Sequence, residues 1–94
     1  MVEVIYSKRA ENDVKLIAHY TILQWGIPAL AKYEYLIDLA INLLKENPNH
    51  LHTREIKGLP SGYRALKLSS INQKNATLRV KNPAHIIYYR HRNR

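Results

Sequence analysis

The stretch from Trp25 to Pro48 reads WGIPALAKYEYLIDLAINLLKENP and predicts the elbow and the second arm of a helical hairpin. Gly26 suits the end of one helix, and Pro28 suits the first turn of the next, where the missing N–H of proline costs nothing. Asn47-Pro48 predicts the end of that second helix, because the residue before a proline is pushed out of the α region. No glycine or proline lies between Pro28 and Asn47, so one uninterrupted helix is expected.

Upstream of the elbow, Ser7 is a candidate N-cap for a first helix that runs to about Trp25. Two stripes of apolar side chains run along this helix. A helix that is apolar on two sides must pack against two neighbours. We expect these neighbours to be the second helix and a sheet. The first stripe comprises Val14, Ile17, Ala18, Thr21 and Trp25, and the second comprises Leu16, Tyr20 and Leu23. Trp25, together with Tyr33, Leu36 and Leu44 of the second helix, is expected to pack in the core.

On both sides of the hairpin the chain alternates with the period of strands. Before the hairpin, Val2–Tyr6 predicts a short opening strand. After it, the alternation predicts an antiparallel meander with strands at 54–57, 63–69, 76–80 and 85–90. A strand, a helical hairpin and an antiparallel sheet make an α+β fold with the two helices packed on one face of the sheet. The length of 94 residues suits a single domain, 1–94.

Charge is the strongest bulk property of the chain. Fifteen Lys and Arg residues against seven Asp and Glu residues give a formal net charge of +8. Five of the seven acids lie in the helical half, whereas the segment 56–94 has nine Lys and Arg residues and no acid. We therefore expect the second half to carry a basic face for an anionic partner, either nucleic acid or an acidic protein.

Several classes of site are disfavoured. The chain has no cysteine, so disulfides and thiolate metal sites are excluded. His50 and His52 lack a nearby third ligand, so neither a metal nor another cofactor is expected. No run of about 18 apolar residues predicts a membrane span, and the first residues lack the pattern of a signal peptide. We therefore expect a cytoplasmic protein that makes no membrane contact.

The side chains best suited to chemistry lie on the strands expected in the second half: Arg64, Arg79, His85, Tyr88, Tyr89 and Arg90. Residues two apart in a strand face the same side, so His85 and Tyr89 share one face, and Tyr88 and Arg90 share the other. Arginines beside a tyrosine and a histidine would bind phosphates and stabilise the charge of a cleaving phosphodiester. They would equally contact an acidic peptide. The plainer alternative is that Tyr88 packs in the core and Arg90 pairs with a helix acid.

From about Tyr6 to Arg90, the chain resembles the ParE branch of the RelE/ParE superfamily of toxins. The resemblance rests on Trp25-Gly26, Ala31, Tyr33, Leu36, Leu44, Asn47-Pro48, Ile56, Gly62-Tyr63-Arg64 and the strand HIIYYR at 85–90. It implies the toxin of a type II toxin–antitoxin module, with two helices packed on a small antiparallel sheet. ParE-like toxins poison DNA gyrase and block replication, whereas RelE-like toxins cut mRNA in the ribosomal A site.

The ParE-like hairpin implies a growth-arresting gyrase inhibitor rather than a catalyst, neutralised by an acidic ParD-like antitoxin. One alternative is a ribosome-dependent mRNA endoribonuclease, whose catalytic residues would be Arg64, Arg79, His85 and Tyr89. A non-toxic regulatory relative is the other alternative. The candidates for binding the target or the antitoxin are Arg64, Lys67, Arg79, Lys81, His85, Tyr89 and Arg90.

Two departures from the family pattern lead to structural expectations. Twenty residues, Ala65–Ala84, separate the Gly62-Tyr63-Arg64 motif from the last strand, which predicts an additional hairpin within Ser70–Lys81. The chain also ends where family members continue with a final strand, so the sheet is expected to have an open edge. Unpaired edges accept another strand, which an antitoxin segment or a second copy of the chain, forming a homodimer, would supply.

Overall fold

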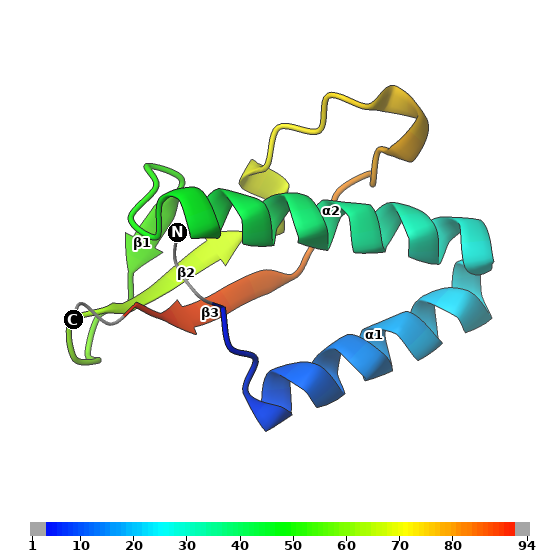
Figure 1. Ribbon diagram of the computed structural model, residues 1–94. Coiled ribbons are helices and arrows are strands. Elements are labelled where there is room, and N and C mark those ends of the chain that lie inside the picture. Colours follow the sequence, from blue (N-terminus) through cyan, green and yellow to red (C-terminus); the bar gives the residue numbers. More distant parts are fainter. Residues whose placement is uncertain (1–3, 92–94) are drawn as a thin grey trace.

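The computed structural model describes residues 4–91, which form two helices followed by a three-stranded antiparallel sheet (Figure 1). Helix α1 spans Lys8–Trp25 and helix α2 spans Ile27–Glu46. The strands are β1 (Thr53–Glu55), β2 (Tyr63–Lys67) and β3 (Ile86–Arg90), and two short 3₁₀ helices, η1 (Leu68–Ser70) and η2 (Ala76–Leu78), lie between β2 and β3. This arrangement confirms the α+β fold expected from the sequence.

The helical hairpin begins, turns and ends at the residues that predict it. The hydroxyl of Ser7 accepts a hydrogen bond of 3.0 Å from the backbone N–H of Ala10, which caps the start of α1. Gly26 alone separates the helices, with a φ of 88° that suits glycine, and Pro28 lies in the first turn of α2. Asn47 is the C-cap of α2. The boundaries of both helices are therefore confirmed.

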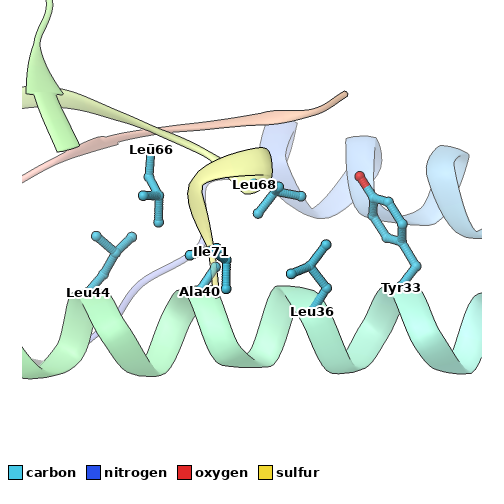
Figure 2. Close-up of a cluster of buried hydrophobic side chains, with 7 residues drawn as sticks. All are labelled: Tyr33, Leu36, Ala40, Leu44, Leu66, Leu68 and Ile71. Atoms are coloured by element: carbon cyan, nitrogen blue, oxygen red, sulfur yellow. The ribbon is translucent and has the colours of Figure 1, made fainter. Parts of the chain in front are cut away.

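The core lies between α2 and the sheet. Figure 2 shows one face of α2 meeting side chains from β2 and from the segment that follows it. The members of this cluster are Tyr33, Leu36, Ala40 and Leu44 from α2, with Leu66, Leu68 and Ile71. The α2 members recur every three or four residues, which places them on one stripe of the helix. Leu36 and Leu66 are fully buried, so the expectation that Tyr33, Leu36 and Leu44 belong to the core is confirmed.

Helix α1 packs against α2, but its second apolar stripe has no partner in the described structure. Leu16, Tyr20 and Leu23 are 62–69% exposed, so the expectation that this stripe contacts the sheet is wrong. Trp25 is 73% exposed and is not a core residue either. Trp25 is the last residue of α1, at the elbow of the hairpin, and Figure 1 shows that this elbow projects beyond the end of the sheet.

The segment between η1 and β3 contains no strand, so the predicted strand Ala76–Val80 and the predicted hairpin within Ser70–Lys81 are both wrong. Instead, the side chain of Gln73 forms hydrogen bonds with the backbone N–H and C=O groups of Val80. Its Nε2 donates to the Val80 carbonyl at 3.0 Å, and its Oε1 accepts from the Val80 N–H at 2.7 Å. A glutamine side chain thus takes the place of a strand partner. The strands predicted at 54–57, 63–69 and 85–90 are present, with shifts only at their ends.

The sheet order is β1-β2-β3, so β3 is an edge strand of the described sheet, as expected. Val4–Tyr6, the described part of the expected opening strand, belong to no strand, and Val2 and Glu3 lie outside the described residues. Within residues 4–91, no helix combines the length and the apolar character needed to cross a membrane.

Candidate functional site

The register of the sheet assigns each strand residue to one of two faces. Leu66, which is fully buried beneath α2, pairs with Ile87, so this row of side chains faces the helix. Because side chains alternate along a strand, Arg54, Ala65 and Tyr88 form the neighbouring row on the opposite side. We call the side that contacts α2 the inner face and the opposite side the outer face.

Two of the predicted site residues, Arg64 and Tyr89, pair with each other on the inner face. The guanidinium of Arg64 donates to Oγ1 of Thr53 from Nε at 3.0 Å and from Nη2 at 2.9 Å. The hydroxyl of Tyr89 donates to the carbonyl of Pro48, just beyond the end of α2. Arg64 therefore connects β2 to β1, and Tyr89 connects β3 to Pro48, just beyond the end of α2. Neither side chain projects from an open surface.

His85 lies just before β3, and its Nδ1 is hydrogen-bonded to the hydroxyl of Tyr33 on α2. The two rings meet edge to face, with centroids 5.5 Å apart and planes at 87°. Burial raises the pKa of Tyr33 to about 12, so its hydroxyl stays protonated at neutral pH. This pair connects the second helix to the start of β3 through a neutral hydroxyl, not through a phenolate base.

Arg79 and Lys81 are exposed residues of the segment between η2 and β3. Neither lies on a strand, which corrects the expectation that Arg64, Arg79, His85 and Tyr89 share one sheet. Arg64 and Tyr89 are on the inner face, His85 is bonded to Tyr33, and Arg79 is outside the sheet altogether. The structure does not bring the four residues together as an RNA-cleaving cluster.

The outer face carries the remaining two predicted binding residues, Lys67 and Arg90. Lys67 pairs with Ile86, and Arg90 pairs with Tyr63. The guanidinium carbon of Arg90 lies 5.0 Å from the centre of the Tyr63 ring, a cation–π contact. Arg90 therefore rests on an aromatic ring of its own sheet, which corrects the alternative that pairs it with a helix acid.

Between these two rows lies the row Arg54–Ala65–Tyr88, in which a small residue separates two large ones. Tyr88 is 67% exposed, so the alternative that packs it in the core is wrong. A cavity of about 450 Å³ lies on the outer face, with Ala65 among the residues that line it. Its walls include Leu51, His52, Arg54, Lys67, Ile86 and Tyr88. The cavity therefore combines two basic side chains and one acid, Glu55, with an exposed aromatic ring.

Arg54 is a functional candidate that the sequence analysis missed, whereas Tyr88 was named there with packing in the core as its alternative. The alternation in HIIYYR already placed Tyr88 on the same face as Arg90, and an arginine usually marks the solvent side of a strand. That signal would have moved Tyr88 out of the core. Nothing comparable identifies Arg54, because its place beside the cavity depends on its pairing with Ala65. Among residues 4–91, no group of three or more His, Asp or Glu residues is placed to hold a metal ion.

Comparison with known proteins identifies a family. The model of a protein family described as "ParE toxin of type II toxin-antitoxin system, parDE" matches residues 4–94. Neither a curated protein nor a solved structure matches the chain. The family match includes the helical hairpin, all three strands and the long segment between β2 and β3.

Proposed function

The chain belongs to the family of ParE toxins of type II toxin–antitoxin systems, and on that premise we propose that it arrests bacterial growth by poisoning DNA gyrase. The observation that carries the proposal is the family match over residues 4–94. As a toxin of such a system, the protein has a cognate antitoxin as its partner. Gyrase as the target places its action in the cytoplasm, where it would block replication.

The placement of the strand residues supports inhibition by binding rather than by RNA cleavage. An acid–base group must reach the proton that it transfers. The hydroxyl of Tyr89 is engaged with the carbonyl of Pro48, and Nδ1 of His85 is engaged with the hydroxyl of Tyr33. Arg64 is bonded to Thr53. These engagements weaken the endoribonuclease alternative.

We further propose that the exposed stripe of α1, formed by Leu16, Tyr20 and Leu23, is where an antitoxin helix docks. An apolar helix face is a common seat for an amphipathic partner helix. The net charge of +8 favours an acidic antitoxin. Leu16→Asp and Leu23→Asp should each weaken antitoxin binding at least tenfold in a calorimetric titration. Leu59→Asp, an exposed leucine in the turn before β2, is the matched control and should bind normally.

The free edge of β3 is a second surface suited to the antitoxin. A hydrogen bond from the N–H of His91 to the carbonyl of Gly62 fixes which β3 residues bond to β2. By alternation, Ile86, Tyr88 and Arg90 direct their backbone N–H and C=O groups to the free side. An extended antitoxin segment would pair there. A second copy of the chain is the alternative occupant, and a homodimer mass in solution without antitoxin would identify it.

Induction of the chain alone in a bacterium tests the proposed function against its alternatives. A gyrase poison should stop thymidine incorporation before methionine incorporation, with growth arrest following. A ribosome-dependent endoribonuclease would stop methionine incorporation first and produce new mRNA ends by primer extension. Continued growth at full expression would identify a non-toxic regulatory relative. Either of these last two results would overturn the proposal.

A further inference from the structure

We propose that the outer face of the sheet binds a single strand of nucleic acid, with Tyr88 stacking on a base and with Arg54, Lys67 and Arg90 contacting phosphates. This inference does not rest on gyrase as the target. It concerns binding by the free protein, on the sheet face opposite α2. The antitoxin surface proposed on α1 belongs to a different element.

The shape of the outer face suits a flat, partly apolar group held at its edges. Neighbouring strands lie about 4.8 Å apart, so the backbones of Arg54 and Tyr88 lie roughly 10 Å from each other, on either side of Ala65. The methyl group of Ala65 forms the floor of the hollow, and the ring of Tyr88 forms one wall. Ile86 adds apolar surface beside Tyr88. A nucleobase offers both the flat face and the apolar area that such a hollow accepts.

The charges of this face suit a phosphate backbone. Arg54 and Lys67 line the cavity together with one acid, Glu55, which leaves a net positive wall. Arg90 adds a further cation outside the cavity. Successive same-face positions on a strand are about 7 Å apart, so Tyr88 and Arg90 present an aromatic ring followed by a cation along β3. The positive track thus continues beyond the hollow, as a polymer requires and a small molecule does not.

The exposed aromatic ring favours a single nucleic-acid strand over an acidic peptide or a duplex. Tyr88 is 67% exposed on the sheet, where an aromatic residue without a partner offers a stacking platform. Base stacking on such a ring strengthens single-strand binding and tolerates different sequences. Bases in a duplex are already stacked on each other, so their faces are closed to Tyr88. An acidic peptide would use the cations but would gain little from the ring.

The experiment measures fluorescence anisotropy of labelled oligothymidylate and oligouridylate of about 12 nucleotides, a length within the range of known single-strand sites. A duplex of equal length and an acidic peptide serve as competitors. We expect Tyr88→Ala to weaken single-strand binding about tenfold or more, the usual effect of losing one stacking side chain. Arg54→Ala should also weaken binding and should reduce its salt dependence. Tighter binding of either oligonucleotide supports the proposal and identifies DNA or RNA as the preferred strand.

The matched controls are Tyr35→Ala, an exposed tyrosine of α2, and Lys15→Ala, an exposed lysine of α1. Both should bind as the unchanged protein does. Circular dichroism melting curves establish that each variant is folded before its affinity is compared. The proposal is overturned if folded Tyr88→Ala binds as tightly as Tyr35→Ala. It is also overturned if the duplex or the acidic peptide binds more tightly than the single strands.

Discussion

The turn before β2 offers a sharp test of how the sheet is held in register. Gly62 has a φ of 97°, and its carbonyl accepts a hydrogen bond of 2.8 Å from the N–H of His91. A Cβ added at Gly62 would lie 2.6 Å from the carbonyl oxygen of His91. That distance is too short for a backbone contact, so Gly62→Ala must move the start of β2 away from the end of β3.

Gly58, in the same loop, serves as a comparison. An alanine there has the cost of the left-handed conformation without the cost of a steric clash. Gly58 has a φ of 86°, but a Cβ there would meet nothing within 4 Å. Each alanine would cost about 1–2 kcal/mol for the left-handed conformation. The entropy that glycine adds to the unfolded chain is the same at both positions and cancels. Gly62→Ala also strains or breaks the bond from His91, worth about 1 kcal/mol. We therefore expect Gly62→Ala to lose about 1 kcal/mol more stability than Gly58→Ala.

Urea unfolding of both variants measures this difference. Far-UV circular dichroism of the two helices is the suitable signal, because Trp25 is exposed and a poor fluorescence reporter. With a slope of about 1 kcal/mol per molar urea for a small domain, the midpoint of Gly62→Ala should lie roughly 1 M below that of Gly58→Ala. Coincident transitions for the two variants would refute the close approach between Gly62 and His91.

Further predictions concern the core, the hairpin and the pH dependence of stability. Leu66→Ala should lower the free energy of unfolding by about 2–5 kcal/mol, whereas exposed Leu23→Ala should change it by less than about 0.5 kcal/mol; similar urea midpoints would contradict the core assignment. Ser7→Ala removes the cap of α1 and should cost about 1 kcal/mol in the same assay, and an unchanged midpoint would argue against the cap. Because the pKa of Tyr33 is raised from 10.0 to about 12 on folding, the unfolded chain releases this proton first, and stability should fall as the pH rises from 10 to 12. The fall is at most about 3 kcal/mol and should be absent from Tyr33→Phe, so parallel pH profiles would contradict the burial of this hydroxyl.

The hairpin was predictable because its signals are local. Ser7, Gly26, Pro28 and Asn47 act on their own backbone or on that of the next few residues, and each occupies the predicted position. The location of the core stripe on α2 followed from the helical period alone. Trp25 was misplaced because its helical position matched a core stripe, while its burial depended on how far the sheet extends. A sequence pattern carries no information about that length.

The segment before β3 and the outer face depended on long-range pairing. The alternation at 76–80 fits a strand, but the side chain of Gln73 satisfies the backbone of Val80, and no strand within residues 4–91 pairs with this segment. The alternation along β3 correctly separated Tyr88 from Tyr89, yet it did not say which of them faces α2. The pairing of Ile87 with buried Leu66 places Ile87, and therefore Tyr89, on the face that contacts α2. Arg54 joins the outer face only through the register of β1 with β2.

The most direct test of gyrase as the target is to incubate the purified protein with DNA gyrase and supercoiled plasmid, and then to denature the enzyme and measure linear DNA. We predict that linear DNA increases with protein concentration in the micromolar range and that an antitoxin added beforehand suppresses it. No linear DNA and unimpeded supercoiling, under conditions in which a related ParE toxin is active, would contradict gyrase poisoning.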